Sequence, residues 1–277
     1  MEIEKMGLDE TESRGILVRI EEAFQAAEGA LAPFRSGAIR ADRKRDQSPV
    51  TEADRAVDKV LREILLRVGE GWLSEETKDS PERLANDSVW VVDPIDGTLE
   101  FIDGIPEWCV SIGYVRDGRA VAGGIFNPAT GEKILGSIAS GVTYNGQPAG
   151  VSERSSLQGA LVLASRSEVK RKEWEGYEEW GFEIRAMGSV AYKLALVAAG
   201  RAEATWTLSP KHEWDVAGGA ALVAAAGGFV STLELAEPRF NQPSCWLPGL
   251  VAGGLPLRDE IAASIQPRTG SRRGRQG

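Results

Sequence analysis

Cysteine and histidine are scarce in this 277-residue chain, which has two of the former and one of the latter. The two cysteines, Cys109 and Cys245, are far apart and form no C-x-x-C pair, so a structural zinc site is not expected. Reduced thiols in a cytoplasmic protein are the natural interpretation. The single histidine, His212, is more simply a surface residue than a catalytic one, although it could assist its neighbour Asp215.

Long hydrophobic runs and a secretory leader are also missing. The longest apolar stretch, residues 217–230, is too short and too rich in glycine to span a bilayer. The first residues, MEIEKMGLDETES, are acidic and polar, unlike a signal peptide. We therefore expect a cytoplasmic protein. A formal net charge of −9 disfavours broad binding to nucleic acid or anionic membranes.

The composition is that of an ordinary globular protein, with 42% hydrophobic and 26% charged residues. Apolar residues recur at helical spacing over residues 16–31 and 53–68, and they predict two amphipathic helices. Ser48 or Thr51 could cap the second helix. The basic segment between the helices, residues 35–49, predicts a mobile loop, or simply a solvated linker.

Short strands follow the second helix. Apolar runs cover residues 88–93, 108–115 and 119–126, and the last two flank the dipeptide Asp117-Gly118. This dipeptide favours a type I′ turn between paired strands. The pattern predicts an antiparallel sheet packed against the two helices.

Strands and helices alternate after about residue 152. The pattern predicts helices at residues 169–180, 188–199 and 216–226, and strands at residues 160–165, 229–233 and 249–252. The expected fold class is α/β, an α+β layered sandwich in which helix and sheet layers alternate. Its N-terminal half has an antiparallel sheet with two helices, and its C-terminal half is α/β.

The predicted boundaries are a flexible N-terminus at 1–12, a first half at 13–150, a second half at 151–265 and a disordered basic tail at 266–277. The tail lacks residues that could form a core. Its arginines could contact nucleic acid, but that hypothesis rests on charge alone.

The strongest local motif is VVDPIDGT. An apolar strand delivers Asp93 to its exposed end, and Pro94 enforces a turn that can bring Asp96 beside it. Two carboxylates at short range repel unless a proton or a cation intervenes, and hard oxygen ligands suit Mg²⁺. Gly97 and Thr98 then begin a helix whose N–H groups could hold a phosphate. A solvated Asx-turn is the alternative.

Three weaker acidic motifs accompany it. LSEE places Glu75 at the end of a short apolar run, EWDVAGG places Asp215 at the start of an apolar helix, and PVTEAD contains Asp54. Each alone has an ordinary explanation, as solvated glutamates, a helix cap or a surface acid. Their combination is far more specific than any single member.

In this order and rough spacing, P-V-T-x-x-D, S-E-E, D-P-I-D-G-T and W-D-x-A-G resemble the signature of the inositol monophosphatase superfamily. The resemblance runs from about Ser13 to Leu257 and includes FIDGIPEWCVSIGYV and GSVAYKLALVAAGRAEA. It implies a phosphomonoesterase that uses two Mg²⁺ ions, with a third held loosely. It also implies a homodimer and sensitivity to lithium.

The resemblance assigns roles residue by residue. The implied metal ligands are all oxygen donors: Glu75, Asp93, the carbonyl of Ile95, Asp96 and Asp215. Asp93 would bridge two ions. The implied catalytic residues would activate the attacking water: Asp54, Thr98 and Glu75. The implied substrate contacts surround the phosphate and the alcohol: Asp96, Gly97, Thr98, Gly188, Ser189, Val190, Asp215 and Lys211.

The substrate is the open question. Residues 185–191 resemble the inositol-type segment, so hydrolysis of inositol monophosphate is the leading prediction. The inositol enzymes commonly have a glutamate where a gapless match puts Leu208, and residues 209–213 are closer to bacterial bisphosphate nucleotidases. Conversion of adenosine 3′,5′-bisphosphate to AMP, with Lys211 on the second phosphate, is therefore the alternative. A non-catalytic regulatory protein on the same fold is a further one, opposed by the intact set of acids.

Overall fold

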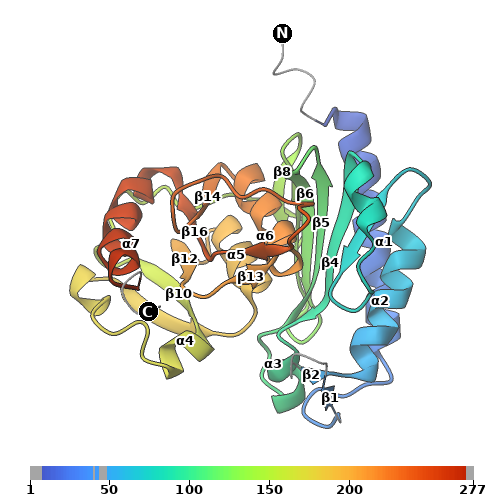
Figure 1. Cartoon of the computed structure of the whole chain (residues 1–277), viewed down its shortest axis with the longest axis horizontal. Coiled ribbons are helices and arrows are strands. Elements are labelled where there is room, and N and C mark those ends of the chain that lie inside the picture. The colour runs from blue at the N-terminus through green and yellow to red at the C-terminus, as the bar shows by residue number, and fades with distance from the viewer. Residues whose placement is uncertain (1–7, 40, 44–48, 273–277) are drawn as a thin grey trace.

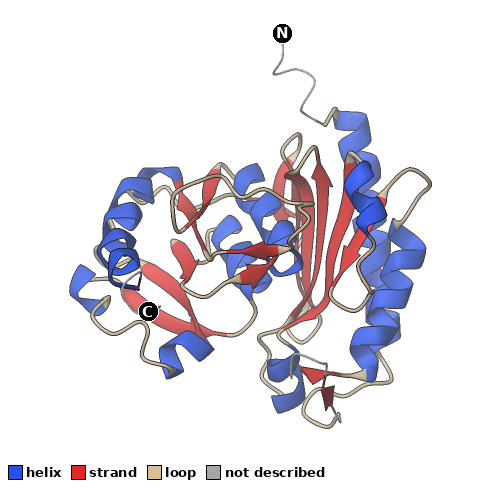
Figure 2. Cartoon of the chain, in the orientation of Figure 1, coloured by secondary structure: helices blue, strands red, loops and turns tan. Residues whose placement is uncertain are grey.

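Five layers, alternately of helices and of sheet, cross the molecule (Figures 1 and 2). The structure, a computed structural model, describes residues 8–39, 41–43 and 49–272. Helices α1 and α2 form the first layer, a seven-stranded sheet the second, α5 and α6 the third, a five-stranded sheet the fourth, and α4 and α7 the last. This arrangement confirms the predicted α/β sandwich of alternating layers.

Helices α1 (Glu10–Leu31) and α2 (Glu52–Leu65) cover the outer face of the first sheet. The side chain of Asp9 caps α1 by accepting a hydrogen bond from the N–H of Glu12 at 2.8 Å. Because of this cap the helix begins at Glu10, so the predicted flexible N-terminus at 1–12 was wrong for its last three residues.

Thr51 caps α2 and was one of the two predicted caps. The other candidate, Ser48, lies outside the described residues. The helix ends at Leu65, short of the predicted end, and Val68 is fully exposed. Just before α2, the two-residue strands β1 (Asp42–Arg43) and β2 (Pro49–Val50) pair antiparallel. The intervening part of the predicted mobile loop lies outside the described residues.

The first sheet has the order β3-β4-β5-β6-β7-β8-β9. Its strands are β3 (Gly71–Ser74), β4 (Ser88–Asp96), β5 (Cys109–Arg116), β6 (Arg119–Asn127), β7 (Glu132–Ser137), β8 (Gly141–Tyr144) and β9 (Gln147–Ala149). All neighbours are antiparallel except β3 and β4. Between β5 and β6, Asp117 has φ 49° and Gly118 has φ 75°, as a type I′ turn requires.

The second sheet has the order β11-β10-β12-β16-β14. Its strands are β10 (Leu161–Ser165), β11 (Glu183–Met187), β12 (Ala204–Thr207), β14 (Gly228–Thr232) and β16 (Leu250–Gly254). The ribbon β13 (Lys211–His212) and β15 (Trp246–Leu247) stands beside it. The first sheet therefore ends before the predicted boundary at residue 151, and the second begins after it.

Helices α5 (Val190–Ala198) and α6 (Glu213–Ala225) are buried between the two sheets. Both are almost entirely apolar, which is the pattern of a helix that is covered on all sides. They come from the second half of the chain and pack against strands of the first. The two halves therefore share one layer.

The predicted helix at 169–180 was wrong. Helix α4 covers only Arg166–Lys170, and a 3₁₀ turn covers Glu178–Trp180. Between them Gly176 has φ 82°, a conformation that ends a right-handed helix. The segment instead buries Trp174, whose ring stacks on Trp206 of the second sheet at 4.8 Å between centroids. Aromatic packing has overridden helical propensity here.

The predicted disordered tail was also wrong in part. Helix α7 (Arg258–Arg272) continues through residues 266–272, and only 273–277 lie outside the described residues. Ile261 and Ile265 are fully buried against the second sheet and anchor the first turns of the helix. Once these turns exist, each added residue gains a hydrogen bond without a new nucleation cost.

Glycines let α6 approach the first sheet very closely. A β-carbon at Gly113 of β5 would lie 2.8 Å from the backbone nitrogen of Gly218 in α6, and one at Gly123 of β6 would overlap the carbonyl oxygen of Gly218. No L-residue with a side chain fits such contacts without a shift of the backbone. This close approach brings the start of α6 to the end of β4.

We expect Gly123→Ala to lower the free energy of unfolding by about 1–3 kcal/mol, because the added methyl forces α6 away from the sheet. The measurement is urea denaturation. Gly15→Ala is the matched control, since nothing lies within 4 Å of a β-carbon at Gly15 on the exposed side of α1. It should raise the same free energy by about 0.5–1 kcal/mol. Equal stability of the two variants would contradict the close contact.

Candidate metal and phosphate site

An irregularity at the end of β4 places two acids on one side of the strand. Asp93 pairs with Ser111 of β5 and Asp96 pairs with Cys109, so β4 has one residue more than its partner. In a regular strand, residues three apart face opposite ways, and an extra residue reverses this alternation. Pro94 favours the irregularity because it has no N–H for the ladder. The predicted turn in DPID therefore takes the form of a β-bulge.

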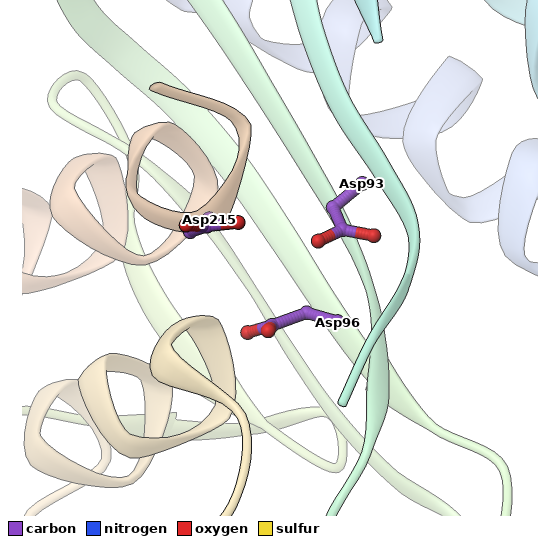
Figure 3. Close-up of side chains that lie close together, drawn as sticks. All are labelled: Asp93, Asp96 and Asp215. Atoms are coloured by element: carbon purple, nitrogen blue, oxygen red, sulfur yellow. The ribbon is translucent and has the colours of Figure 1, made fainter. Parts of the chain in front are cut away.

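A third acid reaches the same point from α6. Asp93, Asp96 and Asp215 each offer a carboxylate oxygen, and these oxygens lie within 4.8 Å of one another (Figure 3). Asp215 stands in the first turn of α6, and its Oδ2 accepts a hydrogen bond from the N–H of His212 at 2.9 Å. The structure thus brings together three of the predicted metal ligands, from two halves of the chain.

Burial makes this cluster electrostatically costly. Burial, and then the charges of Glu75, Asp96 and Asp215, raise the pKa of Asp93 well above its ordinary value. Burial, followed by the charges of Asp96 and Glu75, raises the pKa of Asp215 to about 8. Burial also raises the pKa of Asp96, although hydrogen bonds from Ser189 and Ala191 oppose the shift. Such a cluster requires protons or a cation.

The donor set fits a divalent cation. Three carboxylates offer hard oxygen atoms at short range, and hard oxygen atoms are the ligands that Mg²⁺ prefers. Glu75, which follows β3, is not one of the three clustered acids. Its N–H donates to the carbonyl of Val92 on β4 at 3.3 Å, and its charge raises the pKa of both Asp93 and Asp215. Glu75 therefore lies beside the cluster.

Local hydrogen bonds hold the DPID turn in shape. The N–H of Ile95 donates to Oδ1 of Asp93 at 3.0 Å, so an Asx-turn forms here. Asp93 is buried, so this turn is not the solvated Asx-turn considered as the alternative. The hydroxyl of Thr98 lies 3.1 Å from the carbonyl oxygen of Ile95 and 3.2 Å from Oδ1 of Asp54. The predicted ligand carbonyl and the predicted catalytic pair are therefore direct neighbours.

Asp54 is buried at the start of α2, and Thr51 holds it. The hydroxyl of Thr51 donates to Oδ2 of Asp54 at 2.5 Å, and the Thr51 N–H donates to the same oxygen at 2.8 Å. Burial raises the pKa of Asp54 in spite of these bonds. A chain of side chains from Thr51 through Asp54 to Thr98 thus joins α2 to α3 (Thr98–Asp103). Thr51 was predicted as a helix cap and not as a partner of the catalytic acid.

The predicted phosphate contacts lie where β4 turns into α3. Gly97 is the N-cap of α3, with φ 98°, and a β-carbon there would lie 3.0 Å from the carbonyl oxygen of Glu107. Only glycine adopts this conformation without strain. The backbone amides of Gly97 and Thr98 therefore stand immediately after Asp96.

The predicted contacts to the alcohol lie at the start of α5. The hydroxyl of Ser189 donates to Oδ2 of Asp96 at 2.7 Å, so this side chain holds a predicted metal ligand. Val190 is buried, and the N–H of Gly188 donates to the carboxylate of Glu107 at 2.8 Å. Lys211 of β13 precedes His212, whose N–H contacts Asp215, and the positive charge of Lys211 opposes the rise in the pKa of Asp96 and Asp215.

Two features near the site differ from the sequence-based expectation. His212 is not a plain surface residue, because its ring stacks on Trp214 at 4.3 Å between centroids and contacts the tilted ring of Trp246 at 3.7 Å. Lys193 of α5 is buried beside the acids and was not predicted at all. The only sequence signal for Lys193 is a single charged residue inside the apolar run VAYKLALVA.

The geometry agrees with comparisons to known proteins. A model of the inositol monophosphatase family matches residues 14–265. Inositol monophosphatase 3 of Solanum lycopersicum is 34% identical over 227 residues, covering 76% of this chain and 84% of that protein. Nus factor SuhB of Pseudomonas aeruginosa is 33% identical over 251 residues, covering 84% of this chain and 88% of that protein.

One further relative and two solved structures are also similar to this chain. Fructose-1,6-bisphosphatase/inositol-1-monophosphatase of Thermotoga maritima is 33% identical over 208 residues, covering 73% of this chain and 78% of that protein. The structure of the Thermotoga maritima IMPase has a TM-score of 0.77 at 26% identity, covering 91% of this chain and 98% of that one. Inositol monophosphatase from Anabaena has a TM-score of 0.75 at 26% identity, covering 92% and 96%.

Within the described residues, no helix is long and apolar enough to cross a membrane. The family match covers most of the chain, the solved relatives share its layered fold, and three acids from two of the sequence motifs meet in one cluster. The chain belongs to the inositol monophosphatase family.

Proposed function

We propose that this protein is an Mg²⁺-dependent phosphomonoesterase that hydrolyses a small phosphorylated alcohol by direct attack of water. The observation that carries the proposal is the approach of Asp93, Asp96 and Asp215 to within 4.8 Å of one another at a buried point. A phosphate monoester is an anion, and it would be repelled by three carboxylates alone. The family membership supports the same class of reaction.

Bound Mg²⁺ would neutralise the carboxylates and the phosphate and lower the pKa of the attacking water. Asp93, Asp96 and Asp215 would hold the metal, with the neighbouring Glu75 and the carbonyl of Ile95 as further oxygen donors. Glu75 could reach a third ion through water. The number of ions in use is part of the proposal and follows from the resemblance.

The chain's own residues would handle the proton of the water. The hydroxyl of Thr98 is 3.2 Å from Asp54, so it can orient a water molecule while Asp54 accepts the proton. Burial raises the pKa of Asp54, which favours proton uptake. The amides of Gly97 and Thr98 would bind the phosphate oxygens next to the metal ligands.

Removal of the central carboxylate should abolish turnover. We expect Asp93→Asn to lower kcat for phosphate release by at least about 100-fold at saturating Mg²⁺, because it removes the charge shared by the proposed ions. Asp103→Asn, at an exposed acid in α3, is the matched control and should keep near-normal activity. Near-normal kcat in Asp93→Asn would overturn the metal assignment. No Mg²⁺-dependent turnover in the unaltered protein would instead favour a non-catalytic role, a possibility raised by the relative named Nus factor SuhB.

Stability should depend on pH and Mg²⁺ together. The pKa of Asp215 is about 8 in the folded protein, against an ordinary value of 3.8, so the folded state keeps a proton that the unfolded chain has lost. Without metal, stability should therefore fall as pH rises through this window. Mg²⁺ displaces the proton, so it should raise Tm more at pH 8.5 than at pH 6, by about 2–4 °C per kcal/mol. Differential scanning fluorimetry with EDTA or Mg²⁺ measures this.

Asp215→Asn provides the control for the pH experiment. The amide side chain at residue 215 does not titrate, so the pH dependence of the Mg²⁺ effect should be smaller in this variant. An Mg²⁺ stabilisation that is largest at pH 6 in the unaltered protein would contradict the proposed exchange of protons for metal.

Inositol monophosphate is the leading substrate within this class, because residues 185–191 resemble the inositol-type segment and the family and several relatives carry that name. A specific observation also favours a bisphosphate nucleotide. Leu208 is buried in the apolar cluster of the second sheet, so residue 208 has no carboxylate side chain, whereas the inositol enzymes commonly have a glutamate at the matching sequence position. The cationic Lys211 is near the cluster instead, and it could bind a second phosphate.

A substrate panel with Lys211→Met separates the two candidates. If the substrate is adenosine 3′,5′-bisphosphate, kcat/KM for it should fall about 10–100-fold in this variant, because a charge-assisted contact is lost. Inositol 1-phosphate should be affected less than about threefold. Lys170→Met, at an exposed lysine of α4, is the control. Fructose 1,6-bisphosphate completes the panel, since one relative carries that name. An equal loss for every ester would remove Lys211 as a specificity residue.

The homodimer, lithium inhibition and a cytoplasmic location follow from the resemblance or the composition alone, and they stay predictions. Sedimentation equilibrium and inhibition by LiCl in the same phosphatase assay would test the first two.

A further inference from the structure

Lys193 is a buried cation with a full set of hydrogen bonds. Its side chain is only 2% exposed, and its Nζ donates to the carbonyl oxygens of Ser189 at 2.7 Å, Gly188 at 3.2 Å and Met187 at 3.4 Å. An ammonium group has three N–H donors, so all three are used. Among the described residues, no carboxylate forms an ion pair with it within 4 Å.

These three carbonyls belong to consecutive residues of one turn, residues 187–189, between β11 and α5. Their oxygens converge on one point, which creates a negative potential that a cation relieves. Ser189 has φ 51° and ψ 121°, a conformation that residues with side chains rarely adopt. A β-carbon at Gly188 would overlap the carboxyl group of Glu100. The turn is thus strained and crowded, and the surrounding structure must hold it in place.

The other side of this turn holds Asp96. The hydroxyl of Ser189 donates to Oδ2 of Asp96 at 2.7 Å, and the N–H of Ala191 donates to the same oxygen at 2.6 Å. The Ser189 hydroxyl also accepts from the N–H of Tyr192 at 3.0 Å, which fixes its direction. Both contacts reach Oδ2, so two donors fix the position of this carboxylate. One oxygen of a proposed metal ligand is therefore anchored by two hydrogen bonds.

We propose that Lys193 is a positioning residue for the metal ligand Asp96: its ammonium holds the 187–189 turn in the conformation from which Ser189 and Ala191 fix the Asp96 carboxylate. This inference rests on the proposed function for its catalytic meaning, but not for its effect on metal binding. Lys193 is buried and bound to three carbonyls, so it does not itself touch the substrate. Loss of the ammonium would remove a hydrogen-bond donor from each of the three carbonyls and release the turn.

The test uses Mg²⁺ binding to the full chain, measured by isothermal titration calorimetry without substrate. Lys193→Met keeps the length of the side chain and removes charge and donors, and it should raise the Kd for Mg²⁺ about 10–100-fold. Lys193→Arg keeps charge and donors and should restore most of the affinity. Lys59→Met, at an exposed lysine of α2, is the control and should bind Mg²⁺ normally.

A double-variant cycle tests the route through Ser189. Ser189→Ala removes one anchor of Asp96 and should raise the Kd for Mg²⁺ by less than Lys193→Met does. If Lys193 acts through this turn, Lys193→Met with Ser189→Ala should bind Mg²⁺ no more weakly than Lys193→Met alone. Additive losses would overturn the route through Ser189, and unchanged Mg²⁺ affinity in Lys193→Met would overturn the inference as a whole.

Two further measurements separate a loss of Mg²⁺ binding from a loss of folding and from a loss of catalysis. Circular dichroism and thermal unfolding establish that each variant is folded. If Lys193→Met does not fold, Lys193→Gln, which keeps two donors without the charge, takes its place in the cycle. Phosphate release is measured separately, so a chain that binds Mg²⁺ with the expected pattern but releases no phosphate would support the role of Lys193 and reject the proposed phosphatase.

Discussion

Mutual repulsion among buried carboxylates is the constraint on which the rest of this structure depends. Asp93 and Asp96 come from β4, and Asp215 comes from α6 in the other half of the chain. Burial raises the pKa of each, so electrostatics alone would drive them apart when they are charged. Packing must therefore supply the geometry. The contact between α6 and the first sheet does this, because glycines such as Gly123 allow the two backbones to approach closely.

Helix N-termini partly offset the cost of this cluster. Asp215 accepts a backbone N–H at the start of α6, and Asp96 accepts another at the start of α5. The first turn of a helix carries unpaired N–H groups and a partial positive charge, which favours carboxylates there. Lys193 adds a full positive charge behind the turn that precedes α5. The negative charge that remains suits the site to a divalent cation, and the first turns of both central helices contact its acids.

The acidic cluster indicates a class of reaction, but it does not identify the substrate. Metal ions can bind the phosphate group of many different esters, so the cluster supports a reaction class and not a particular substrate. Substrate choice would depend on other side chains, and here Leu208 is buried in an apolar cluster while Lys211 carries a positive charge beside His212. Leu208 directly follows β12, and Lys211 begins β13.

The sequence by itself determined the layered fold class, both N-terminal helices, the type I′ turn at Asp117-Gly118 and the acids of the site, because each depends on neighbours along the chain or on a short motif. The tertiary structure alone decided features that depend on distant partners. Stacking on Trp206 replaced the expected helix around Trp174, and docking against the second sheet extended helix α7 into the expected tail. Lys193 gave almost no signal, because a lone lysine in an apolar helix acquires its role only when a folded turn points three carbonyls at it.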